Sequence, residues 1–133
     1  ANLADRLQEK LATITQVQVG VEHIDIQFYR DDLVKNHADP QIKHLSFTHN
    51  LTDKTVVIVD DVLYTGRTVR AAMDAILDVS RPQVIRLAIM VDRGHRELPI
   101  RADFIGKNIP TAQEENVHVC LQEVDGTEEI LLT

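Results

Sequence analysis

The apolar residues of the chain follow two spacings, one typical of helices and one typical of strands. Residues 3–14 place an apolar side chain at every third or fourth position among charged residues, which predicts an amphipathic helix. Between residues 17 and 28 the apolar positions alternate in two opposite registers, so we expect a strand with a bulge near residues 22 and 23. Residues 33–54 are polar, which predicts a long excursion with a short hairpin around residues 45–47, of the kind that often serves as a lid.

The middle of the chain predicts a strand–helix–strand unit. Residues 56–59 form a continuous apolar run that ends at two aspartates, as in a strand covered on both faces within a parallel sheet. Residues 69–77 carry an apolar helical stripe, and residues 84–91 predict a second buried strand. This order favours an α/β fold with a right-handed parallel crossover. Short strand candidates follow at residues 104–109, 117–121 and 130–132, with a turn at residues 125 and 126.

Length and composition predict one globular domain, residues 1–133. The chain has 44% hydrophobic residues, enough for a single core. It contains no apolar run that could span a bilayer and no secretory signal pattern, so we expect a cytoplasmic protein without a membrane partner. Its one cysteine, Cys120, excludes an internal disulfide and is expected to be a small buried residue. The net charge of −7 opposes non-specific binding to nucleic acid but allows a local basic patch.

The segment from residue 56 to 68 carries the clearest chemistry. A buried strand delivers Asp60 and Asp61, and a short loop with Thr65 and Gly66 then opens a helix at Thr68. The amino end of a helix offers unpaired N–H groups to a phosphate, and glycine allows close approach of the backbone. The carboxylates would repel that phosphate, and they suit ribose hydroxyls or the water on a bound Mg²⁺.

These residues together predict a ribose 5-phosphate site. The alternative is that they are only a strand end, a turn and a helix cap. Other phosphate motifs are absent, since the chain has neither G-x-x-x-x-G-K-[ST] nor G-x-G-x-x-G.

The segment matches the phosphoribosyl-pyrophosphate (PRPP) signature of type I phosphoribosyltransferases. With residues 29–33, 91–103 and 106–110, the chain resembles the bifunctional pyrimidine operon attenuation regulator and uracil phosphoribosyltransferase family from residue 1 to about 124. The resemblance implies the type I phosphoribosyltransferase fold, a mostly parallel sheet flanked by helices, with a C-terminal β extension. It also implies a transferase that converts uracil and PRPP to UMP and pyrophosphate, and UMP-dependent binding of pyrimidine operon mRNA by a homo-oligomer.

The resemblance assigns roles to residues of this chain. We expect Mg²⁺ to enter with PRPP, without direct protein ligands. The catalytic residues implied are Asp60, Asp61, Arg30 and Asp31. The PRPP and UMP site comprises Asp60, Asp61, Val62, Leu63, Tyr64, Thr65, Gly66, Arg67 and Thr68. The base would contact Asp92 and Arg93, and the RNA surface would include His95, Arg96, Arg101 and Lys107.

Three of these assignments have alternatives in the residues themselves. Arg30 and Asp31 stand where the lid begins and could touch pyrophosphate, or they could be a solvated strand end. The segment 93–107 has four basic side chains against two acids, a footprint for an RNA backbone, but such clusters are usually solvated faces, and pyrophosphate could also be their partner. Tyr64 stands where purine-specific relatives have an acid, which favours a pyrimidine, although a tyrosine without a catalytic role fits equally.

Two other functions stay open from the sequence. The chain could be a nucleotide-sensing RNA-binding regulator without useful catalysis, or a purine phosphoribosyltransferase, which Tyr64 disfavours. The family also has a strand and a pyrophosphate-binding loop before the first helix, whereas the sequence here begins at Ala1 within that helix. We therefore expect either that the sequence is incomplete or that another element fills the place, and that these 133 residues alone have little transferase activity.

Overall fold

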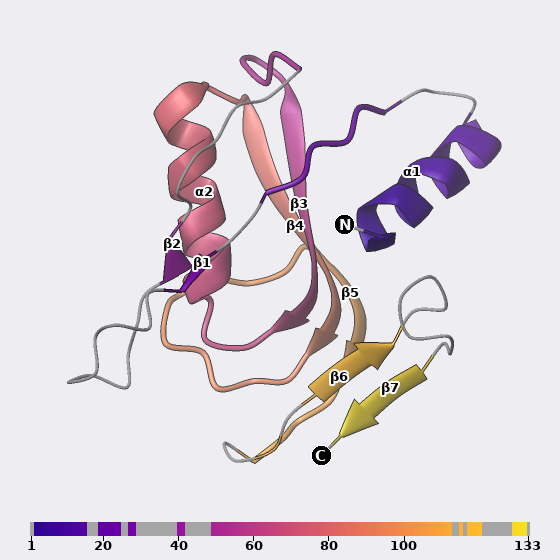
Figure 1. Cartoon of the computed structure of the whole chain (residues 1–133), viewed down its shortest axis with the longest axis vertical. Coiled ribbons are helices and arrows are strands. Elements are labelled where there is room, and N and C mark those ends of the chain that lie inside the picture. The colour runs from indigo at the N-terminus through magenta and orange to yellow at the C-terminus, as the bar shows by residue number, and fades with distance from the viewer. Residues whose placement is uncertain are drawn as a thin grey trace.

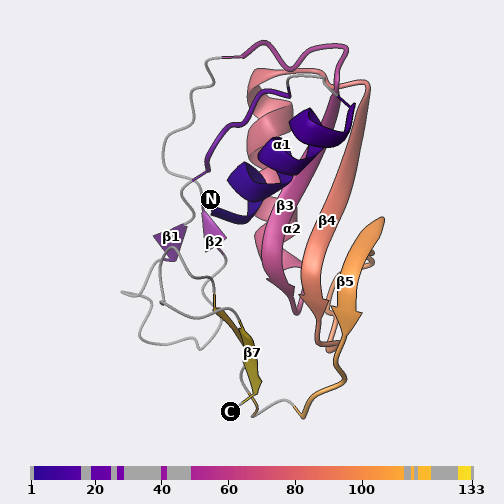
Figure 2. The ribbon, with the colours of Figure 1, turned by 90° about the vertical axis from the view of Figure 1, so that its right-hand side faces the viewer.

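A parallel sheet between two helices forms the centre of the part of the chain that the structure describes. The structure is a computed structural model that describes residues 2–15, 19–24, 27–28, 40–41, 49–112, 115, 117–120 and 129–132. The central sheet has the order β3-β4-β5, with α2 on one face and α1 on the other (Figures 1 and 2). The bounds of these elements are Thr55–Leu63 for β3, Val84–Asp92 for β4, Phe104–Asn108 for β5, Asn2–Thr15 for α1 and Arg67–Val79 for α2.

Two small antiparallel pairs lie outside the central sheet. Strand β1 (Gln27–Phe28) pairs with β2 (Pro40–Gln41). Strand β6 (Val117–Cys120) pairs with β7 (Glu129–Leu132), and β6 contacts β3. The expected α/β class, the helix at residues 3–14 and the terminal hairpin strands are thus confirmed.

The strand–helix–strand unit forms as its sequence predicts. Strands β3 and β4 pair in parallel, as do β4 and β5. Helix α2 ends at Val79, since Ser80 is extended and Pro82 follows. The core cluster lies between α2 and the sheet and comprises Leu63, Val69, Leu87, Ile89 and Ala102.

Strand β3 is longer and less covered than the apolar run predicts. It continues through Asp60 and Asp61 to Leu63, because its pairing with β4 extends to Leu63 opposite Asp92. The expectation of complete cover was wrong at Val57, whose residue surface is 45% exposed. Among the described residues no strand pairs with the second edge of β3. The neighbouring strand expected there stays a prediction.

The strand predicted between residues 17 and 28 was wrong for residues 19–24 and confirmed for residues 27 and 28, and residues 17, 18, 25 and 26 lie outside the described part. Among the described residues of this range, 19–24 form no strand and Gln27–Phe28 is strand β1. Alternating apolar residues need a neighbouring strand to form a ladder. Here other partners hold the segment: Glu22 accepts a hydrogen bond from the backbone N–H of His49 at 2.8 Å, and the carbonyl of Val19 accepts one from the side chain of Gln8.

Some expectations concern residues outside the described part. These are Arg30 and Asp31, the hairpin at residues 45–47, the turn at residues 125 and 126, and the side chain of Cys120. In the described ranges, neither the length nor the hydropathy of any helix suffices to cross a bilayer.

Ile76 and Leu77 test which face of α2 supports the fold. Ile76 is 2% exposed, whereas Leu77, expected in the apolar stripe, is 56% exposed. We expect Ile76→Ala to lower the free energy of unfolding by about 2–4 kcal/mol, because it removes buried methyl groups and leaves a cavity. The matched control, Leu77→Ala, should change it by about 0.5 kcal/mol or less. Urea unfolding measures both, and equal losses would contradict the packing described here.

Candidate nucleotide-binding site

The loop between β3 and α2 presents the amino end of α2. Gly66 precedes the helix with φ 93°, a left-handed conformation that favours glycine. The first helical hydrogen bond runs from the Arg70 N–H to the Gly66 carbonyl at 3.0 Å. The Arg67 N–H donates to the Thr65 hydroxyl at 3.2 Å. In the described part of the chain, the N–H groups of Thr65, Gly66 and Thr68 donate to no acceptor. They are therefore available to an anion.

Segment 93–98 holds the other side of this loop. Three successive loop carbonyls accept hydrogen bonds from it, which fixes the loop and leaves its N–H groups on the side away from these donors. The bonds are Arg93 N–H to Leu63 O at 3.1 Å, Arg96 Nη1 to Tyr64 O at 2.8 Å, and the N–H groups of Glu97 and Leu98 to Thr65 O at 2.9 and 3.1 Å.

Side-chain contacts join the same two segments. Arg67 donates from Nε to Glu97 Oε1 at 2.8 Å. A Cβ on Gly66 would lie 3.3 Å from the Ile100 side chain and 3.5 Å from that of Leu98. The loop is therefore packed closely as well as hydrogen-bonded, and position 66 has no room for a larger residue without a shift of its neighbours.

Asp60 and Asp61 lie at the carboxyl end of β3. Asp60 Oδ1 accepts the Asp61 N–H at 2.8 Å, and Asp61 Oδ1 accepts the Val62 N–H at 2.7 Å. Burial, followed by the hydrogen bond and negative charge of Asp61, raises the pKa of Asp60 to about 7. Asp60 is therefore partly protonated near neutral pH, and a bound cation or donating hydroxyl groups would favour its ionised form.

The donor chemistry of this pair fits Mg²⁺ only in part. Carboxylate oxygens are ligands that Mg²⁺ prefers, and Mg²⁺ usually completes its shell with water and phosphate oxygens. Among the described residues there is no group of three or more His, Cys, Asp or Glu side chains that could hold a metal ion. The pair therefore suits a cation that arrives with a phosphorylated ligand.

Arg96 and Asp92 form an ion pair at the end of β4. Arg96 Nη2 lies 2.6 Å from Asp92 Oδ2, and the Gly94 N–H donates to Asp92 Oδ1 at 3.0 Å. Burial by itself would raise the pKa of Asp92, but the hydrogen bonds from Arg96 and Gly94 and the charge of Arg96 outweigh it and hold that pKa below its usual value. Asp92 is thus a fixed carboxylate.

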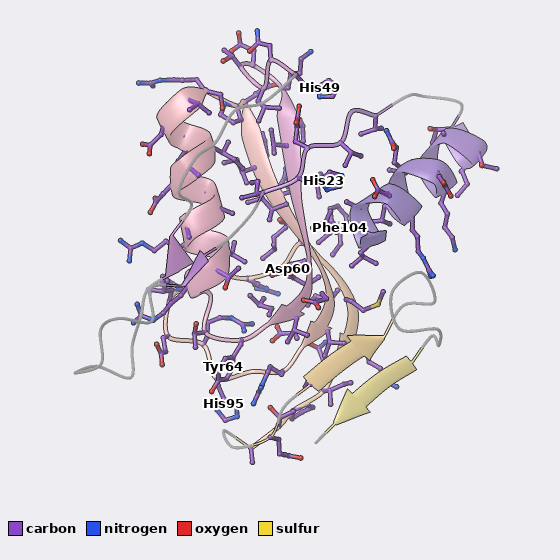
Figure 3. All side chains as sticks on the ribbon, viewed as in Figure 1. His23, His49, Asp60, Tyr64, His95 and Phe104 are labelled. Atoms are coloured by element: carbon purple, nitrogen blue, oxygen red, sulfur yellow. The ribbon has the colours of Figure 1, made fainter. Side chains whose placement is uncertain are left out.

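Tyr64, Arg93 and His95 form a cluster beside the loop. The Arg93 guanidinium lies 4.1 Å from the centre of the Tyr64 ring, and the His95 ring meets Tyr64 edge-on at 6.1 Å. Figure 3 shows Tyr64 and His95 side by side beyond the ends of β3 and β4. Arg93 is only 6% exposed and donates to Thr111 Oγ1 and the Ala112 carbonyl, each at 3.1 Å.

Comparison with known proteins identifies the fold and the family. Residues 2–124 match the model of the phosphoribosyl transferase domain. The chain belongs to the phosphoribosyl transferase domain family. It is 58% identical to the bifunctional protein PyrR of Fusobacterium nucleatum and 53% identical to that of Clostridioides difficile, in both cases over 98% of this chain and 73% of the relative.

Solved structures support the fold alone. The hypoxanthine phosphoribosyltransferase of Trypanosoma cruzi, in complex with the product IMP, has a TM-score of 0.66 at 24% identity, covering 86% of this chain and 57% of that one. The hypoxanthine phosphoribosyltransferase of Staphylococcus aureus has a TM-score of 0.61 at 20% identity, covering 77% of this chain and 54% of that one. The family and the fold expected from the sequence are confirmed, as is the expected class of function, a regulator of the bifunctional phosphoribosyltransferase type.

The predicted site residues of this phosphoribosyltransferase domain fall into two groups. The structure brings Tyr64, Arg93, His95 and Arg96 together at the carboxyl ends of β3 and β4, with their side chains bonded or packed within the chain. Arg101 and Lys107 are exposed. Sequence reasoning missed Thr111, Ala112 and Ile100 as partners of these arginines, because hydroxyl and backbone acceptors leave no pattern in a sequence.

Asp60→Asn tests the raised pKa of Asp60. The pKa of Asp60 is raised from 3.8 to about 7 by folding, so its favourable contribution to stability is complete below pH 4 and is lost as the pH rises through 7. We expect the variant to have a higher Tm than the wild type at pH 8, with the difference shrinking toward zero at pH 4. Thermal unfolding without Mg²⁺ measures this.

The matched control for this test is Asp74→Asn, which changes an exposed carboxylate on α2. Its Tm difference from the wild type should stay nearly constant over the same pH range. A Tm difference between Asp60→Asn and the wild type that does not change with pH, or that grows on acidification, would contradict the raised pKa of Asp60.

Proposed function

We propose that the loop from Asp60 to Thr68 binds the ribose 5-phosphate part of PRPP and UMP, and that the protein transfers this group to uracil. We further propose that bound UMP controls binding of pyrimidine operon mRNA. One observation carries the proposal: the carbonyls of the loop are held by segment 93–98, so its N–H groups and the amino end of α2 face an anion. The identity of 53–58% to PyrR proteins supports it.

The two halves of the loop take different parts of the ligand. The N–H groups of Thr65, Gly66 and Thr68, with the two threonine hydroxyls, suit the 5-phosphate. Asp60 and Asp61 accept hydrogen bonds from the ribose hydroxyls. In the transfer, the bond from C1 to pyrophosphate breaks, a bond from C1 to a uracil nitrogen forms, and the proton of that nitrogen is lost. The residues contribute mainly by positioning the two reactants.

The base site lies beside Tyr64. Asp92 ends β4 and Arg93 follows it, with its guanidinium over the Tyr64 ring. Position 64 is thus a tyrosine and offers no carboxylate to handle a purine N7. This arrangement favours uracil over a purine. Arg30 and Asp31 complete the proposal as residues of the lid that would close over pyrophosphate.

We infer three further properties of the protein. Mg²⁺ enters with PRPP, where it would neutralise charge on the leaving pyrophosphate. The protein acts in the cytoplasm, where both PRPP and messenger RNA occur. Residues 1–133 act as one domain of a homo-oligomer, which agrees with the exposed apolar side chains of Phe104 and Ile105 on β5.

UMP synthesis from uracil and PRPP tests the enzymatic role. We expect the Asp60→Asn and Asp61→Asn double variant to lose about 100-fold or more in kcat/KM, because the ribose is no longer positioned. The control Asp74→Asn should retain the activity of the unchanged protein. Hypoxanthine should not replace uracil. Binding of UMP without any turnover by the unchanged protein would instead support a regulator without useful catalysis.

The salt dependence of RNA binding tests the exposed basic residues. Arg101→Ala and Lys107→Ala should each weaken binding of pyrimidine operon RNA and reduce the slope of log K against log salt by about 0.7–1 per lost phosphate contact. Arg81→Ala, which changes an exposed arginine between α2 and β4, should leave the slope unchanged. An unchanged slope for both Arg101→Ala and Lys107→Ala would place the RNA elsewhere.

A further inference from the structure

Arg96 is hydrogen-bonded to three separate parts of the chain. Its side chain is 24% exposed. It donates from Nη1 to the Tyr64 carbonyl at 2.8 Å, from Nη2 to Asp92 Oδ2 at 2.6 Å and from Nε to the Ile100 carbonyl at 2.8 Å. One guanidinium thus joins three parts of the chain: the loop from Asp60 to Thr68, called the PRPP loop below, the end of β4, and the segment that leads to β5.

We propose that Arg96 is a positioning residue for the PRPP loop, which it holds in the conformation that binds the ribose 5-phosphate. This inference rests on the proposed function. It gives Arg96 a role different from the RNA contact that the family resemblance implies. The effect of losing Arg96 on RNA binding would then be indirect and would follow from the loss of bound nucleotide.

The geometry of the three bonds explains why an arginine is required. A guanidinium is planar and presents its N–H groups in a fixed fork, so donors on different atoms can reach three acceptors at once. A lysine ammonium carries the same charge on one atom at the end of a flexible stem. It could pair with Asp92 but could not also reach both the Tyr64 and the Ile100 carbonyls in this arrangement.

Of the three hydrogen bonds, the one to the Tyr64 carbonyl matters most for the ligand. It lies between the carbonyls of Leu63 and Thr65, which backbone N–H groups of segment 93–98 hold. Only the middle one of these three carbonyls depends on a side chain. Removal of Arg96 therefore frees the peptide that leads into Thr65 and Gly66, whose N–H groups face the phosphate.

The charges around Arg96 agree with an internal role. Its carboxylate partner, Asp92, is 13% exposed at the side chain and has a pKa held below its usual value. Arg101 is exposed on the chain between β4 and β5, and it is better placed than Arg96 for an RNA phosphate. We therefore expect loss of Arg96 to weaken nucleotide binding and loss of Arg101 to weaken RNA binding.

The experiment compares Arg96→Lys and Arg96→Ala with the control Arg101→Lys in the same protein. UMP affinity is measured by calorimetry, the KM for PRPP and kcat by steady-state kinetics, and RNA affinity over a series of salt concentrations. We expect Arg96→Lys to fold with a Tm near that of the unchanged protein, to bind UMP about 10-fold more weakly and to raise the KM for PRPP by a similar factor, as expected when charge-assisted hydrogen bonds are lost.

RNA binding separates a positioning role from a phosphate contact. For Arg96→Ala with UMP at saturation, we expect the unchanged salt slope, because no phosphate contact is lost. Added guanidinium ion should restore part of the UMP affinity of Arg96→Ala, whereas added ammonium ion should not. Arg101→Lys should bind UMP as the unchanged protein does.

Several outcomes would overturn the inference. Unchanged UMP affinity in Arg96→Lys would do so, as would a salt slope lowered by about one unit in Arg96→Ala with UMP binding intact, which would assign Arg96 to an RNA phosphate. Failure of both Arg96 variants to fold would assign it to stability alone. Absence of UMP binding by the unchanged protein would refute the proposed function itself, a result that needs no variant.

Discussion

The parallel pairing of β3 with β4 is the constraint on which the site depends. The pairing runs from Thr55 opposite Val84 to Leu63 opposite Asp92. Because parallel strands end on the same side of the sheet, the loop before α2 and the segment after β4 leave the sheet at neighbouring points. The ladder even continues one step further, as the Arg93 N–H donates to the Leu63 carbonyl. The contacts between the PRPP loop and segment 93–98 follow from this register.

Segment 93–98 satisfies the carbonyl groups of the loop and leaves its N–H groups available. The loop offers carbonyl oxygens, and segment 93–98 supplies backbone N–H groups and one guanidinium. Among the described residues, no buried side-chain nitrogen or oxygen is left without a partner. A loop held in this way needs little rearrangement when a ligand arrives, so more of the binding free energy remains for the ligand itself.

The sequence predicted the elements with one buried face and missed those that depend on distant partners. Helix α2 and strand β4 have apolar residues at the spacing that burial against one side requires. The end of β3 was missed because Asp60 and Asp61 look like the end of a strand, whereas the ladder with β4 continues past them to Leu63. Residues 19–24 alternate like a strand but are held by Gln8 and His49 instead.

The residues of the candidate site could be proposed from the sequence, but their contacts could not. The resemblance to the PRPP signature pointed to the loop from Asp60 to Thr68 without any structure. The bond from Arg96 to the Tyr64 carbonyl spans 32 residues and ends on a backbone oxygen, which every residue has. Nothing in the identity of Tyr64 therefore signals it. The bond from Arg93 to the carbonyl of Ala112 likewise ends on a backbone oxygen and leaves no pattern in the sequence.

The proton on Asp60 changes how the site meets an anion from a distance. The chain carries a formal charge of −7, and its field opposes the approach of any phosphorylated molecule. With a pKa of about 7, the Asp60 carboxyl carries on average about half a negative charge at neutral pH, whereas an aspartate in water carries nearly a full one. A partly protonated Asp60 therefore repels an approaching anion less than an ionised carboxylate would.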